Sequence, residues 1–145
     1  MSARPVGILS SALRQAFGVV LVACLPFTLV AGTGSPLPTV ADLLVDGLQP
    51  GERFGASVAT AGDVNGDGYS DIIVGMPDHD NGANTDAGRV MVFHGSASGL
   101  TGTVAWVMMG TMANARFGHS VSTAGDVNGD GFSDIIIGAP GHGGQ

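Results

Sequence analysis

Short apolar runs separated by turn residues make up the chain after Val40. Four of these runs, at residues 56–60, 71–75, 88–94 and 103–109, occur within about 60 residues. Apolar residues do not recur there at helical spacing, whereas Gly, Asp, Asn and Pro cluster between the runs. The pattern therefore predicts an all-β fold built from an antiparallel sheet of four short strands.

One long segment of the chain occurs twice. Residues 53–77 align without a gap with residues 116–140, at an offset of 63, and 20 of the 25 positions are identical. A four-stranded repeat of this length is typical of a β-propeller blade. The second copy stops before its third strand, so we expect a partial propeller of about one and a half blades from a longer protein. Assembly of several copies into a closed ring is the alternative.

Apolar residues of the first repeat are expected to pack between blades. The continuous run 72–74 is typical of an inner strand that is buried on both faces. Phe54, just before the first strand, is expected to fill the space between blades. Trp106, with Val104 and Met108, is expected to form a packed face of the outer strand.

The main chemical signal is an aspartate-rich loop in each copy. Carboxylate and amide oxygens at alternate positions of a glycine-rich loop are what Ca²⁺ requires, whereas Mg²⁺ needs a stricter octahedral cage. We predict two Ca²⁺ sites, one in each loop. The ligands of the first site are the side chains of Asp63, Asn65, Asp67 and Asp71 and the carbonyl of Tyr69. Those of the second are the side chains of Asp126, Asn128, Asp130 and Asp134 and the carbonyl of Phe132.

Two other kinds of loop have a similar composition. An EF-hand needs an acidic residue at its twelfth position and flanking helices, but Val74 and Ile137 stand there, within β-branched runs. A pair of metal-free Asx turns would also use Asp, Asn and Gly. Three carboxylates within nine residues would then repel one another, and the pattern recurs, so the sequence favours calcium.

The motifs around the loops resemble the FG-GAP repeat of the integrin α-subunit β-propeller. Phe54-Gly55, the first loop and Gly75-Met76-Pro77 look like one repeat, and Phe117-Gly118, the second loop and Gly138-Ala139-Pro140 look like another. The resemblance covers residues 48–141, and only Met76 departs from the Gly-Ala-Pro sequence of the motif. It implies a propeller whose Asp-rich loops bind Ca²⁺ structurally, not catalytically.

The N-terminus is predicted to be a signal peptide over residues 1–31. Arg4 and Arg14 precede the apolar run 16–31, which is too short for a typical membrane span. An uncleaved anchor is one alternative, and lipoprotein cleavage before Cys24 is another. The rest of the chain is predicted to divide into three parts. Residues 32–47 are a linker and the start of the first strand region, residues 48–110 are the first repeat, and residues 111–145 are a truncated second repeat.

Charge and cysteine content restrict the possible partners. The formal net charge is −7, and six of the twelve acidic residues lie in the two loops. Such a chain repels nucleic acid and anionic membranes, so contact with a membrane is expected only through an anchor at Cys24 or an uncleaved signal. The single cysteine excludes a disulfide within the chain.

These features predict an exported, non-enzymatic propeller for adhesion or recognition, secreted or at the cell surface, with a protein or glycan ligand. If Cys24 is lipidated, it would be a bacterial outer-envelope lipoprotein. An accessory propeller of a secreted hydrolase and a carbohydrate-binding lectin propeller are the alternatives.

Ser57 and Ser120 lack a nucleophile-elbow motif. The acidic residues and His79 within 78–86 are expected to form a solvated loop.

Overall fold

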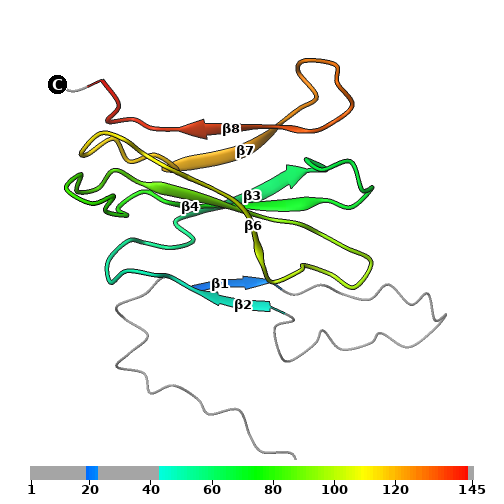
Figure 1. Cartoon of the computed structure of the whole chain (residues 1–145), viewed down its shortest axis with the longest axis horizontal. Helices are drawn as coiled ribbons and strands as arrows, with labels where there is room; N and C mark the ends of the chain where they lie inside the picture. Colours follow the sequence, from blue (N-terminus) through cyan, green and yellow to red (C-terminus); the bar gives the residue numbers. More distant parts are fainter. Residues whose placement is uncertain (1–18, 23–42, 144–145) are drawn as a thin grey trace, which may run out of the picture.

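The computed structural model describes residues 19–22 and 43–143, and every regular element among them is a strand (Figure 1). In chain order the strands are β1 (Val19–Val22), β2 (Leu43–Asp46), β3 (Ser57–Gly62), β4 (Asp71–Met76), β5 (Arg89–Phe93), β6 (Val104–Met109), β7 (Ser120–Gly125) and β8 (Asp134–Gly138). Accordingly, this part of the chain contains no helix able to cross a membrane.

Strands β3 to β6 form one antiparallel sheet in sequence order, as predicted. Strands β7 and β8 form a separate hairpin that repeats the first two strands of that sheet. Ser57 pairs with Gly75 in the first hairpin, and Ser120 pairs with Gly138 at the same register in the second. The all-β, four-stranded prediction is confirmed, since the repeated sequence builds the same hairpin twice.

The three sheets lie in layers (Figure 1). The β7–β8 hairpin lies on one side of the four-stranded sheet, and the β1–β2 hairpin lies on the other. Strand β1 falls inside the predicted signal peptide, so cleavage after residue 31 would remove it. The signal peptide remains a prediction, and Cys24 lies outside the described residues.

Side chains of β4 point alternately into two apolar clusters. Val74 joins Phe54 and residues of β4 and β5 on the side of β2, whereas Ile73 joins a cluster that the second hairpin covers. Burial of β4 on both faces is therefore confirmed. Phe54 is buried too, but it packs on the side of β2 and not between the two blades. The packing prediction is wrong for β6: this edge strand is exposed along its whole length, and Trp106 remains 40 % accessible.

Glycines allow the second repeat to approach the first closely. A Cβ on Gly75 would collide with the carbonyl of Gly118, and one on Gly88 would collide with the backbone of Phe117. The hydroxyl of Ser57 donates to the same Gly118 carbonyl at 2.7 Å. These contacts explain why the motif needs glycine at position 75, and they give Ser57 a structural hydrogen bond.

Candidate metal centre

A β-bulge directs the chain into each aspartate loop. The register shifts between Thr60 and Gly62 in the first hairpin, and at the equivalent Thr123 and Gly125 in the second. Each glycine has a positive φ, and each threonine hydroxyl accepts a hydrogen bond from the glycine amide at 3.1 Å. A bulge increases local twist, so the loop begins in the same direction in both repeats.

Asp63 is the hub of the first loop. Its Oδ1 accepts hydrogen bonds from the amides of Gly66 at 2.7 Å and Asp67 at 3.1 Å, and its Oδ2 accepts one from Gly68 at 2.8 Å. The amide of Gly68 lowers the pKa of the Asp63 carboxyl most, desolvation opposes it, and the neighbouring amides lower it further. The carboxylate is therefore ionised at neutral pH and stabilises the turn by accepting hydrogen bonds from three amides of the loop.

The other predicted side-chain ligands divide into an exposed pair and a buried residue. Asn65 donates to Asp67 Oδ2 at 2.9 Å, and both side chains are exposed. Asp71 is fully buried at the start of β4, where its carboxylate accepts hydrogen bonds from the amides of Val64 and Gly95, each at 2.8 Å. Asp71 therefore ties the first loop to the segment after β5.

The second loop repeats these hydrogen bonds within its own sequence. Asp126 accepts hydrogen bonds from the amides of Gly129, Asp130 and Gly131, and Asp130 accepts one from Phe132. Asp134 accepts a hydrogen bond from Val127 at 2.8 Å but is only half-buried. Asn128 accepts a hydrogen bond from Asp130, as Asn65 does from Asp67.

The donor chemistry of both loops fits Ca²⁺, which binds carboxylate and carbonyl oxygens. An ionised carboxylate offers about four acceptor positions, and Asp63 uses three of them, so ligand capacity remains. Within residues 19–22 and 43–143, however, no three acidic, His or Cys side chains converge into a metal-binding group. In this structure the loops are stabilised by hydrogen bonds from their backbone amides to the aspartate carboxylates.

The second loop lies directly against the first. Ser133 donates its amide to the carbonyl of Asp63 at 2.8 Å, and its hydroxyl accepts a hydrogen bond from the Asp63 amide at 3.1 Å. A Cβ on Gly66 would lie 2.6 Å from the ring of Phe132. The sequence identified the two loops but not this contact, because nothing in the repeat spacing says which loops become neighbours.

One part of the acidic loop after β4 is buried, contrary to the prediction. The His79 Nδ1 and Glu52 Oε2 atoms are 2.6 Å apart, and both residues are buried. Asp78 lies between two exposed arginines, 3.4 Å from Arg53 and 3.9 Å from Arg116. The solvated-loop prediction is wrong for His79, since Glu52, distant in sequence, supplies a buried partner for its imidazole.

Comparisons with known proteins agree with this arrangement. The FG-GAP repeat model matches residues 54–93 and 117–145, the two segments that carry the hairpins and their loops. The chain is an FG-GAP repeat protein. FG-GAP repeats are β-propeller blades, so β3–β6 form one blade, and β7–β8 correspond to the first two strands of the next.

Among curated proteins the chain is similar to integrin α subunits. It is 39 % identical over 102 residues to integrin alpha-PS2 of Drosophila melanogaster, a match that covers 66 % of this chain and 7 % of the relative. It is 31 % identical over 110 residues to integrin alpha-5 of Xenopus laevis, covering 73 % and 10 %. It is 42 % identical over 104 residues to integrin alpha pat-2 of Caenorhabditis briggsae, covering 63 % and 8 %. The chain is thus an integrin-α-like FG-GAP propeller module that spans a small part of its relatives.

Proposed function

We propose that this FG-GAP module is an exported, calcium-stabilised β-propeller segment that takes part in adhesion or recognition at the cell surface. The observation that carries the proposal is the duplicated aspartate loop, with the same hydrogen bonds around Asp63 and Asp126. Similarity to integrin α subunits supports the adhesive role. The ligand is proposed to be a protein or a glycan.

Each ion would be held by the oxygen ligands of one loop. The first loop supplies the side chains of Asp63, Asn65, Asp67 and Asp71 and the Tyr69 carbonyl, and the second supplies those of Asp126, Asn128, Asp130 and Asp134 and the Phe132 carbonyl. When bound, Ca²⁺ neutralises neighbouring carboxylates, so the free energy of binding adds to the free energy of unfolding. The chain's own contribution is the amide-braced turn, which holds Asp63 and Asp67 close together before any ion binds.

The calcium proposal predicts a rise in thermal stability with Ca²⁺. At a calcium concentration of about 1 to 10 times the Kd, each site adds roughly 0.4 to 1.4 kcal/mol to the free energy of unfolding. Extracellular calcium modules have Kd values of about 10⁻⁴–10⁻³ M, so millimolar Ca²⁺ should raise the Tm and chelation should lower it. Asp67→Ala and Asp130→Ala should each remove part of this shift.

Asp86→Ala is the matched control, since Asp86 belongs to the acidic loop between β4 and β5 and not to either aspartate loop. It should leave the calcium-dependent rise in Tm unchanged. If chelation leaves the Tm of the unsubstituted chain unchanged, the calcium proposal is wrong.

Export and adhesion are measured separately. N-terminal sequencing of the secreted or surface-bound protein should find a start at or near Gly32, or a lipidated Cys24. Cells should adhere to a surface coated with the chain in Ca²⁺ and adhere less to one coated with the Asp67→Ala/Asp130→Ala variant. Equal adhesion to both coatings would contradict a calcium-dependent adhesive function.

A further inference from the structure

Asparagine is followed by glycine at three places in the chain: Asn65-Gly66, Asn81-Gly82 and Asn128-Gly129. Asparagine is a thermolabile residue, because its side-chain carbonyl carbon can be attacked by the backbone nitrogen of the next residue. Glycine has no side chain to hinder that attack. In a folded chain the reaction also depends on what the glycine N–H is bonded to, and the three sites differ in this respect.

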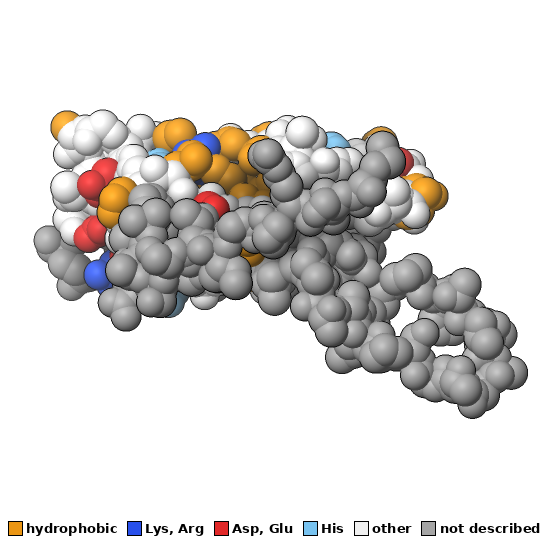
Figure 2. Space-filling view, turned by 90° about the horizontal axis from the view of Figure 1, so that it is seen from below, with side chains coloured by type: hydrophobic (Ala, Val, Ile, Leu, Met, Phe, Trp, Pro, Cys, Tyr) orange, Lys and Arg blue, Asp and Glu red, His pale blue; other side chains and the backbone are white. Residues whose placement is uncertain are grey.

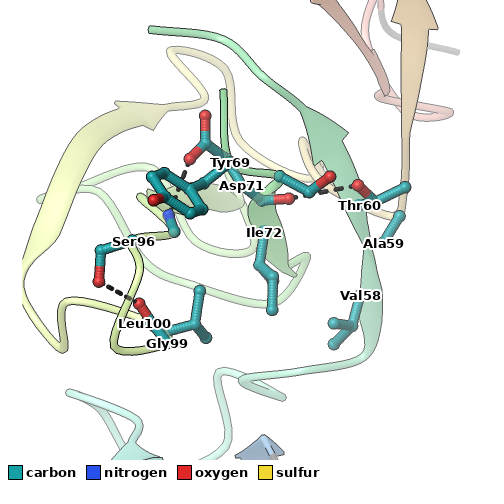
Figure 3. A pocket seen from close by; sticks show the side chains of 11 residues that line it. Val58, Ala59, Thr60, Tyr69, Asp71, Ile72, Ser96, Gly99 and Leu100 are labelled. Carbon is teal, nitrogen blue, oxygen red and sulfur yellow. Dashed lines mark hydrogen bonds between the residues drawn. The ribbon is translucent and has the colours of Figure 1, made fainter. Parts of the chain in front are cut away.

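Solvent access does not distinguish the three sites, since all three glycines are exposed. The first aspartate loop also borders an open hollow of about 490 Å³ (Figure 3). The part of the loop that lines this hollow consists of Tyr69, Ser70 and Asp71. We therefore compare the hydrogen bonds of the glycine amides.

In both aspartate loops the glycine amide donates to a carboxylate. Gly66 donates to Asp63 Oδ1 at 2.7 Å, and Gly129 donates to Asp126 Oδ1 at 2.7 Å. The nitrogen must lose this proton before it can attack, and the adjacent carboxylate disfavours a second negative charge there. Each loop therefore protects its own asparagine.

The third sequence lies at the tip of the segment between β4 and β5, at the opposite end of the blade from the aspartate loops (Figure 1). Asn81 and Asn84 close a two-residue turn by mutual backbone hydrogen bonds of 3.0 and 3.1 Å. Gly82 is the first central residue of this turn and has a φ of 64°. Its amide takes no part in the closing pair, and no acceptor within residues 19–22 and 43–143 receives its N–H.

We propose that Asn81 is a site of spontaneous deamidation in the folded chain, whereas Asn65 and Asn128 are protected. The Gly82 nitrogen gives up its proton and bonds to Cγ of Asn81. The bond from Cγ to Nδ2 then breaks, and ammonia leaves with the proton. Water opens the resulting succinimide ring at one of its two carbonyls, which yields aspartate or isoaspartate. Water thus replaces ammonia, with no oxidant or reductant.

Deamidation of Asn81 removes a contact between two loops. Its Nδ2 donates to the carbonyl of Gly110 at 2.9 Å, and in the aspartate product a carboxylate faces that carbonyl. The same segment already carries Asp78, Asp80 and Asp86, and acidic side chains are visible at this end of the molecule in the view from below (Figure 2). Because like charges repel, the tip at residues 81–84 should separate from the segment after β6.

Peptide mapping of the full chain by mass spectrometry tests the proposal. The chain is incubated for increasing times in calcium-free buffer in which circular dichroism shows it to be folded. Asn81 should convert to the acidic products with time, while Asn65 and Asn128 remain amides. In concentrated urea all three should react at similar rates, because the protecting hydrogen bonds are lost. An unreactive Asn81, or equal rates at the three sites of the folded chain, would overturn the proposal.

Asp63→Ala tests the cause of the protection. It removes the acceptor of the Gly66 amide, so Asn65 should become reactive. Asn128 is the internal control, because Asp126 is unchanged in this variant and should still protect it. If Asn65 stays as unreactive as Asn128, the carboxylate does not protect the loop and the proposed difference between the sites is wrong.

Asn81→Asp reproduces the aspartate product and tests its effect on the loop. Hydrogen exchange of the amides at positions 81 and 84 should be faster than in the unsubstituted chain. Asn114→Asp is the matched control, since it adds the same charge at an exposed asparagine whose φ of 58° aspartate also tolerates. It should leave that exchange unchanged. Equal exchange in the two variants would contradict release of the tip by deamidation.

Discussion

The loops at 63–71 and 126–134 differ at one position, Tyr69 against Phe132, yet they have different surroundings. The first lies between the second loop and the segment after β5. Its Asp71 is fully buried and accepts hydrogen bonds from two backbone amides. The second loop packs on the first with one side only, and its Asp134 is half-buried and accepts one bond.

The comparison separates what a loop does for itself from what its neighbours add. The hydrogen bonds around Asp63 and Asp126 are the same and depend only on local sequence. The bonds of Asp71 to Gly95 and of Ser133 to Asp63 depend on elements that pack against the loop. Equivalent substitutions in the two loops should therefore have unequal effects.

The largest difference is expected between Asp71→Ala and Asp134→Ala. Removing the Asp71 carboxylate leaves two backbone donors without an acceptor, at about 1–3 kcal/mol each when buried. Removing that of Asp134 leaves one exposed donor and should cost about 1 kcal/mol. Urea unfolding in chelator, which removes any contribution from calcium, measures both. Equal losses would show that burial of Asp71 contributes little.

A smaller difference is expected between Gly66→Ala and Gly129→Ala. Both glycines have a φ of 77°, so the backbone strain of alanine is the same in each. Only Gly66 has the Phe132 ring above it, and the added methyl group must displace that ring at a further cost of about 1 kcal/mol. Thermal unfolding measures the difference, and adding Phe132→Ala should abolish it. Equal destabilisation would mean that the ring does not pack there.

Ser133→Ala should lower the free energy of unfolding by about 1 kcal/mol, since it removes the acceptor of the Asp63 amide. Ser70→Ala is the matched control at the same repeat position, where the side chain lines the open hollow. Hydrogen exchange of the Asp63 amide should speed up in the first variant and not in the second. Unchanged exchange in both variants would rule out this hydrogen bond in solution.

The smallest effect concerns acid stability. The pKa of Asp63 in the folded chain is lowered from its ordinary value of 3.8, so its contribution to stability is present above that value and is lost as the pH falls through the lower, folded pKa. Asp63→Asn should reduce the loss of stability below about pH 4, as followed by urea unfolding at stepped pH. If the unsubstituted chain and the Asp63→Asn variant lose the same stability below about pH 4, this role of Asp63 is contradicted.

Much of the fold could be predicted because it rests on local patterns. Alternating and continuous apolar runs predicted all four strands of the first blade, and Val74 is buried as expected. The predicted packing of Trp106 was wrong, because burial of an edge strand depends on a partner that covers it and not on its own hydrophobicity. His79 was mispredicted for a related reason, since its partner Glu52 is 27 residues away.

The sequence by itself determined the repeat, the hairpin with its bulge and the internal hydrogen bonds of each aspartate loop. These follow from glycine positions and from side chains that bond amides two to seven residues away. Only the tertiary structure decided that Ser133 and Phe132 close over the first loop, that Asp71 is buried and that the hollow beside Tyr69 is open. Those outcomes depend on which hairpin packs against which, and two nearly identical segments cannot by themselves specify their different neighbours.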